Sequence, residues 1–217
     1  MIPTEWTHFR AIDYHESVSW AIPFVSLSGY NEAFVWGELN PSPERNTTLM
    51  IAEMIASKSG DYRFQMNLID PLAVKTQSNT GTSVVEDLNH IFNIYRKEGK
   101  CTGGTWESWD TKSTVGRDRL RERLMNAALC KEPFKNEVVK NGIMIRLPTL
   151  WVFNTCVNTY RSLQQWRIEG EKPAQEHSHF CMALEALMKD VRFKPRIIDY
   201  ETPQRKKPYL SYFRTQK

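Results

Sequence analysis

Short runs of apolar residues near the start of the chain predict three antiparallel strands. Polar and apolar positions alternate over 7–13, and β-rich runs follow over 20–28 and 32–39. The Gly-Tyr-Asn sequence at 29–31 is a turn signal between the last two runs. Because the connections are too short to hold crossover helices, we expect these strands to form an antiparallel meander.

Helical and strand periodicity alternate through the rest of the chain. Asn46 or Thr47 can cap a helix that runs to Gly60, and a strand that ends in an acid is expected over 63–70. The other predicted elements are a loop or short strand at 102–106, one or two strands over 143–153, and helices at 84–97, 115–129, 157–166 and 178–191. This order predicts an α/β fold in which helices flank a mixed sheet.

The composition is that of a folded cytosolic protein. Of the 217 residues, 41% are hydrophobic and 25% are charged, close to the average for folded proteins, and no apolar run is long enough to cross a membrane. The first residues lack the pattern of a signal peptide, and the four cysteines lie far apart without a CxxC spacing. We therefore expect a reduced protein without disulfide bonds or structural zinc.

Positive charge gathers at the end of the chain. Between residues 192 and 217 the sequence has eight basic and two acidic residues, so the remainder is slightly acidic although the net charge is +4. This predicts one domain over 1–193 and a basic tail over 194–217. Aromatic residues interleave the basic ones, which suits a nucleic-acid backbone or an acidic protein, and a solvated terminus is an equally simple interpretation.

Two acids stand where predicted strands end. Asp13 and Asp70 each follow an apolar run, and ligands of open α/β sheets gather outside the carboxyl ends of strands. Carboxylates on neighbouring strands, about 5 Å apart, could bridge the divalent cations used for phosphodiester cleavage. For either residue alone, a turn or a helix cap is the simpler interpretation. His15 and Glu16, directly after Asp13, could make an outer contact or be solvated loop residues.

A third ligand would have to come from later in the chain. Glu176 and His179 are three residues apart near the start of the predicted helix over 178–191, so they could share one helix face. His179 could then be a metal ligand, or a base or proton shuttle near the metal. Alternatively, Glu176, His177 and Ser178 only cap the helix. Phosphate-loop, GxSxG and HExxH motifs are all absent from the sequence.

Basic residues outside the acidic pair are candidates for DNA contacts. Arg117 and Arg121 share a face of the predicted helix over 115–129 and could follow phosphates, although interspersed acids also fit a solvated, ion-paired face. Trp106 and Trp109, flanked by glycine and polar residues, are expected to be exposed, whereas the other tryptophans are expected mainly in the core. The candidate DNA contacts are Lys75, Lys112, Arg117, Arg121, Arg205, Lys206 and Lys207.

Five short motifs, in this order and spacing, resemble one known family. They are FRAIDYH at 9–15, FVWGEL at 34–39, LID at 68–70, VFNTC at 152–156 and HFCMAL at 179–184. Over roughly residues 7–191 the chain resembles the C-terminal nuclease domain of the large terminase subunit of tailed bacteriophages. The resemblance implies an RNase H-like mixed sheet, made of an antiparallel three-strand meander plus parallel strands and flanked by helices.

The resemblance also implies an activity and a metal site. It implies a metal-dependent endonuclease that cuts concatemeric double-stranded viral DNA when packaging starts and ends, with little sequence specificity and with one or two Mg²⁺ or Mn²⁺ ions. Asp13 and Asp70 match the first and second acids of the family. The final helix departs from the family pattern, because Ser178, His179 and Met182 stand where two of the three residues are usually acids. Either Glu176 is the third carboxylate, or His179 binds one metal, or a second metal is held weakly.

The partners implied by the resemblance are those of a packaging motor in the host cell cytoplasm. They are double-stranded viral DNA, a terminase ATPase domain, the small terminase subunit and the portal protein, with no membrane. No ATPase motif is encoded, so we expect an excised fragment or a gene product split from its motor. Two alternatives are a catalytically weak module that docks DNA or the portal, and a resolvase-type RNase H-like nuclease.

Overall fold

The structure is a computed structural model of the chain. It describes residues 2–78, 81–101, 104–130, 132, 136–166, 168–169, 172–173, 178–190 and 192. The predicted tail over 194–217 and the candidate ligand Glu176 lie outside the described residues.

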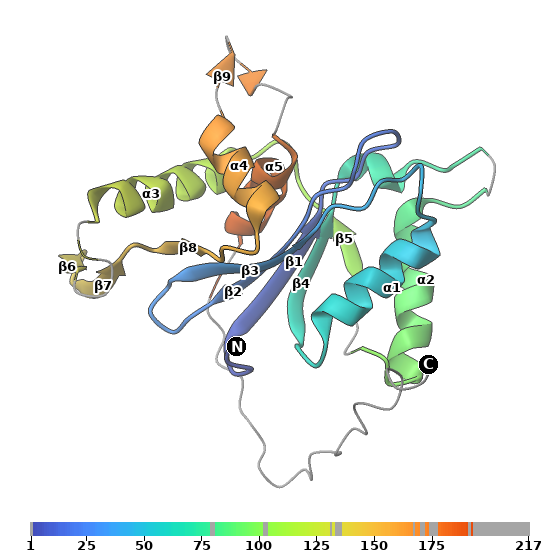
Figure 1. Cartoon of the computed structure of the whole chain (residues 1–217), viewed down its shortest axis with the longest axis horizontal. Coiled ribbons are helices and arrows are strands. Elements are labelled where there is room, and N and C mark those ends of the chain that lie inside the picture. The colour runs from blue at the N-terminus through green and yellow to red at the C-terminus, as the bar shows by residue number, and fades with distance from the viewer. Residues whose placement is uncertain are drawn as a thin grey trace, which may run out of the picture.

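A six-stranded mixed sheet forms the centre of the fold (Figure 1). Its strands, in spatial order, are β5 (Trp106–Ser108), β4 (Phe64–Ile69), β1 (Thr7–Ile12), β2 (Ile22–Leu27), β3 (Ala33–Leu39) and β8 (Leu150–Val152). Strands β1, β2 and β3 form an antiparallel meander, whereas β4 is parallel to β1, β5 to β4, and β8 to β3. The predicted mixed sheet with a three-strand meander is therefore confirmed.

Helices cover both faces of the sheet (Figure 1). Helices α1 (Thr48–Ser59) and α2 (Val84–Lys97) lie on one face, and α3 (Val115–Leu129), α4 (Val157–Gln165) and α5 (His179–Met188) lie on the other. The smaller elements are the 3₁₀ helix η1 (Pro71–Val74) and two hairpins, β6 (Asn136–Lys140) with β7 (Ile143–Leu147) and β9 (Ile168–Glu169) with β10 (Lys172–Pro173). In the part of the chain that the structure describes, each helix is too short or too polar to span a membrane.

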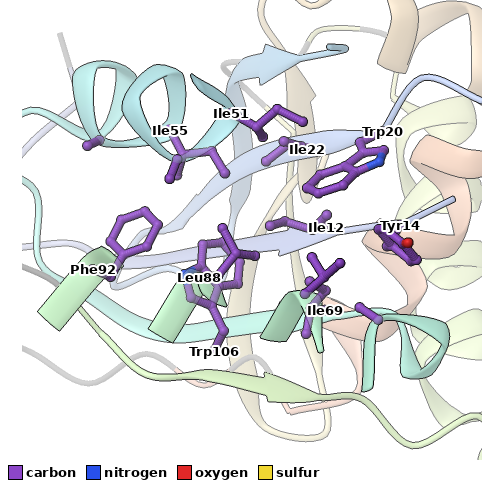
Figure 2. Packing of buried hydrophobic residues seen from close by; sticks show 14 of the residues in the cluster. Ile12, Tyr14, Trp20, Ile22, Ile51, Ile55, Ile69, Leu88, Phe92 and Trp106 are labelled. Carbon is purple, nitrogen blue, oxygen red and sulfur yellow. The ribbon is translucent and has the colours of Figure 1, made fainter. Parts of the chain in front are cut away.

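One hydrophobic core lies between the sheet and the helix pair α1 and α2. Strand β1 is buried along its whole length because helices cover both of its faces, so its side chains pack alternately into the two cores. The first core joins isoleucines of the sheet to apolar side chains of both helices. Figure 2 shows its members Ile12, Ile22, Ile69, Ile51, Ile55, Leu88 and Phe92.

A second core holds α5 against the opposite face of the sheet. Phe9 of β1 and Val25 of β2 pack there with Leu184 and the other apolar residues of α5. Helix α3 packs closely on α5 at Gly116, where an added Cβ would lie 1.9 Å from the carbonyl oxygen of Glu185. Only glycine permits this approach, and it fixes the helix that carries His179.

The prediction that Trp106 and Trp109 are exposed was wrong. They are 1% and 9% exposed. Trp106 begins β5, which α2 covers, and the Asn89 side chain of α2 hydrogen-bonds both the backbone N–H and the carbonyl of Trp106. The Trp106 ring also packs beside the buried guanidinium of Arg10, 4.8 Å from the ring centroid. Neighbouring glycines and polar residues therefore did not indicate exposure.

Candidate active site

The ends of strands β1 and β4 bring two aspartates to the same edge of the sheet. The strands are parallel, Ile12 lies opposite Ile69, and the backbone N–H of Asp70 donates to the carbonyl of Ile12 over 2.9 Å. Asp13 follows β1 directly and Asp70 follows β4. Asp13 and Asp70 are 4% and 7% exposed, so both carboxylates are largely removed from water. They lie on adjacent strand ends, whose backbones are about 5 Å apart.

Local backbone contacts fix both aspartates in place. Asp13 pairs with Ala21 through two backbone hydrogen bonds, of 2.9 and 3.2 Å. Pro71 has no N–H to continue a ladder, so β4 stops and η1 begins. Asp70 caps η1, because its Oδ1 accepts the backbone N–H of Leu72 over 2.7 Å. The capping role that the sequence suggested for Asp70 is thus real, and it leaves the second carboxylate oxygen of Asp70 available.

His179 reaches the pair from α5. It is the first residue of that helix, and its Nδ1 lies 2.8 Å from Oδ2 of Asp13. This hydrogen bond raises the pKa of His179, partial burial lowers it, and the charge of Asp13 raises it further. The ring of His15 lies edge-on to the His179 ring, with 6.1 Å between centroids. The structure therefore brings His179 to Asp13 and His15 to His179, and the charges of both histidines act on Asp70.

The electrostatic environment of the pair disfavours two negative charges. Burial raises the pKa of Asp70, the hydrogen bond from Leu72 lowers it, and the nearby Asp13 carboxylate raises it again. His15 and His179 lower the pKa of Asp70 by smaller amounts. A bound cation would relieve the repulsion between the two carboxylates.

The donor chemistry of the pair fits a hard divalent cation. Within the described residues, Asp13 Oδ1 and Asp70 Oδ2 accept no hydrogen bond, so each aspartate has one oxygen to offer. Mg²⁺ is commonly held by one or two carboxylates and completed by water and substrate phosphates. Among the described residues, no group of three or more histidine, cysteine and acidic side chains is arranged to hold a metal. The described part of the site thus fits one such ion with two protein carboxylates.

The predicted DNA contacts occupy different environments. Lys75 lines a cleft together with Tyr14 and His15, the two residues after Asp13. Arg117 pairs with Glu185 of α5, with 3.2 Å between Nε and Oε1, and Arg121 lies 5.9 Å from the ring centroid of Trp166. Lys112 follows β5 in a loop, whereas Arg205, Lys206 and Lys207 lie outside the described residues.

A third acid at this edge of the sheet was missed from the sequence. Asp110 comes shortly after β5, which is parallel to β4 and adjacent to it. Its side chain is 49% exposed, and its Oδ2 lies 2.7 Å from Nζ of Lys189, which lowers the pKa of Asp110. The strand-end argument would have found Asp110 if the three-residue strand β5 had been recognised. It is ion-paired with Lys189 and so offers a matched control.

Comparison with solved structures identifies the fold. The large terminase of a thermophilic bacteriophage, solved in complex with ADP, matches 88% of this chain with a TM-score of 0.59 and 12% sequence identity. The P22 large terminase nuclease domain matches 86% of this chain with a TM-score of 0.57, also at 12% identity. The predicted resemblance to large terminase nuclease domains is therefore confirmed at the level of the fold.

The extent of these matches differs between the two proteins. This chain spans 40% of the large terminase chain from the thermophilic phage and 82% of the P22 nuclease-domain chain. No protein-family model matches the sequence, and no curated protein is detectably similar to it in sequence. The likeness is thus one of structure, at a level of identity that shows the fold alone.

Proposed function

We propose that this chain is the metal-dependent DNA endonuclease of a viral genome-packaging terminase. The observation that carries the proposal is the placement of Asp13 and Asp70 at the ends of adjacent parallel strands, on the fold of a large terminase nuclease domain. The reaction is hydrolysis of a phosphodiester bond in concatemeric double-stranded DNA at the start and end of packaging. Little sequence preference is expected, because no base-reading motif is present.

Asp13 and Asp70 would hold Mg²⁺ or Mn²⁺. Such an ion, when bound, lowers the pKa of a coordinated water and neutralises charge on the scissile phosphate. The protein contributes the orientation of its carboxylates: Leu72 fixes Asp70, and His179 fixes Asp13 by occupying its Oδ2. Glu176 remains a candidate third carboxylate on the segment before α5, and His179 remains a candidate ligand for a second ion.

The assignment as a terminase nuclease also leads to proposals for the DNA contacts and the partner proteins. Lys75 is the best placed of the basic candidates, because it lines the cleft together with Tyr14 and His15. Lys112, Arg117, Arg121 and the tail are proposed to contact phosphates farther from the cleavage point. Because the chain spans 40% of the large terminase from the thermophilic phage, we propose that an ATPase domain, the small terminase subunit and the portal protein complete the machine in the host cytoplasm.

One observation favours the alternative of a weakly cutting docking module. The described residues supply two carboxylates at adjacent strand ends and no three-residue metal cluster. A domain with incomplete ligands would still bind DNA through its basic residues but cut it slowly.

Nicking of supercoiled plasmid by the full chain in Mn²⁺ tests the proposal. Wild type should nick, and both Asp13→Asn and Asp70→Asn should lower the rate by about 100-fold or more, since each removes a carboxylate from the proposed metal site. The matched control Asp110→Asn, which changes an acid at the next strand end, should keep the rate within about threefold.

Two results would contradict the assignment. Failure of wild type to nick in Mn²⁺ or Mg²⁺ would support the docking module, and equal nicking by wild type and the Asp13 and Asp70 variants would place the activity elsewhere. Preferential cutting of branched over linear duplexes would instead support the resolvase-type nuclease.

A further inference from the structure

A large cleft is lined by residues that follow Asp13 and Asp70 in the chain. It has a volume of about 1020 Å³, at the upper end of the roughly 300–1,000 Å³ that small-molecule sites occupy. The residues after Asp13, those after Asp70, and the first turns of α1 and α2 form its walls. Its polar lining includes Tyr14, His15, Asn46, Lys75, Gln77 and His90.

Several side chains that line this cleft can form hydrogen bonds to a sugar-phosphate chain. Amide and hydroxyl side chains from the segments before α1 and α2 line it, together with Lys75 and two histidines. Glu16 and Asp87 are the acids that also line it. Hydrogen-bond donors of this kind position nucleic-acid backbones without reading bases.

His15 stands between this cleft and the aspartates, and its tautomer is fixed by the backbone. Its Nδ1 accepts the N–H groups of Ser17 and Val18, each over 3.2 Å. Since Nδ1 uses its lone pair, the ring proton of the neutral imidazole is on Nε2. The indole N–H of Trp20 donates to the carbonyl of His15 over 2.9 Å and holds the residue in place. Nε2 has no hydrogen-bond partner within the described residues.

We propose that the Nε2–H of His15 binds a phosphate oxygen of a DNA strand whose adjoining nucleotides lie in this cleft. This inference takes its substrate class, DNA, from the proposed function. To that function it adds the path of the DNA strand through the cleft and one residue that binds the strand. Half-buried His15 lines the cleft and lies edge-on to His179, so a phosphate bound there adjoins the Asp13–Asp70 pair. Its role is to place the phosphate, and its contribution should therefore persist without metal.

Two substitutions of His15 distinguish the Nε2–H donor from the contact of Nδ1 with the backbone N–H groups of Ser17 and Val18. In His15→Asn the amide oxygen can take the position of Nδ1 and still accept from Ser17 and Val18, but the Nε2–H donor is lost. In His15→Gln the amide nitrogen can take the position of Nε2 and restore the donor. Ser17→Ala is the control, because it removes only a hydroxyl that lies 3.3 Å from Nδ1.

The test is the affinity of the full chain for a fluorescent duplex of about 20 base pairs in EDTA, at one pH and salt concentration, alongside thermal melting of each variant. Loss of one hydrogen bond to a charged phosphate should weaken binding by about tenfold in His15→Asn. His15→Gln should bind within about threefold of wild type, and Ser17→Ala should bind like wild type.

Three outcomes would overturn the inference. They are wild-type affinity in His15→Asn, equal weakening in both His15 variants, and absence of duplex binding by wild type. The nuclease assignment fails separately: if wild type does not nick plasmid but the His15 variants bind as expected, the cleft binds DNA and the proposed cleavage is wrong. If wild type nicks and His15→Asn binds normally, only the role of His15 is wrong.

Discussion

At the residue scale, the site keeps a carboxylate where burial and a neighbouring charge disfavour it. Burial and Asp13 raise the pKa of Asp70 in spite of the hydrogen bond from Leu72. The native state therefore holds a proton on Asp70 more tightly than the unfolded chain does. Ionised Asp70 costs stability, which is typical of sites arranged for binding rather than for folding.

Asp70→Asn should therefore stabilise the apo protein at neutral pH. The variant keeps an oxygen for the Leu72 N–H but removes the charge, so we expect its free energy of unfolding to rise by about 1 kcal/mol. The penalty in wild type is absent below the unfolded pKa, about 3.9, and is complete once the pH exceeds the raised native pKa. Urea unfolding at about pH 3 and about pH 7 should thus show the difference only at the higher pH. A variant less stable than wild type at neutral pH would contradict this account.

The sequence predicts the two aspartates of this site better than it predicts their contacts. Asp13 and Asp70 could be found because each ends an apolar run, and strand ends meet at a sheet edge. The bond between His179 and Asp13 spans 166 positions and depends on how α5 lies across the sheet, which no local pattern encodes. The orientation of His15 depends in the same way on the turn formed by Ser17 and Val18.

At the element scale, a carboxylate from the sheet holds the start of α4. Glu38 of β3 accepts the backbone N–H groups of Asn158 and Thr159 over 2.9 and 2.8 Å, and it also accepts the side-chain donors of the same two residues. Helix starts have unsatisfied N–H groups and favour negative charge, so Glu38 satisfies both needs. Helix α4 packs on α5 and so supports the helix that carries His179.

Glu38→Ala should therefore destabilise the fold by about 2 kcal/mol, because two N–H groups of α4 lose their partners and the favourable charge disappears. Glu38→Gln retains one oxygen acceptor and should lose about 1 kcal/mol. The midpoint of urea unfolding, measured for all three proteins, checks the order. Equal midpoints for wild type and Glu38→Ala would show that the contact does not hold α4.

Element boundaries follow from the sequence where capping residues mark them. Helix α2 begins at Val84 as predicted because Ser83 and Glu86 form a capping box. Strand β6 was missed, although it pairs fully with β7. Strand β5 is only three residues long, and its identity depends on pairing with β4, so a local pattern could give no more than a loop or short strand.

At the scale of the whole molecule, the sheet and the two helix layers that cover it bring the candidate site residues to the carboxyl ends of β1 and β4. The order of elements predicts a sheet flanked by helices, but not which helices share a face. Packing decides this, since Gly116 admits α5 against α3 and the isoleucines of α1 match those of the sheet. The large cleft is built by segments that are far apart in the sequence, so no single sequence motif predicts it.

The most direct test of the central claim is a crystal structure of the full chain soaked in Mn²⁺, with anomalous scattering recorded at a wavelength sensitive to manganese. The account predicts an anomalous peak within about 2–2.5 Å of one oxygen of Asp13 and one oxygen of Asp70. An ordered site without such a peak at saturating Mn²⁺, or a peak bound only by other residues, would contradict it.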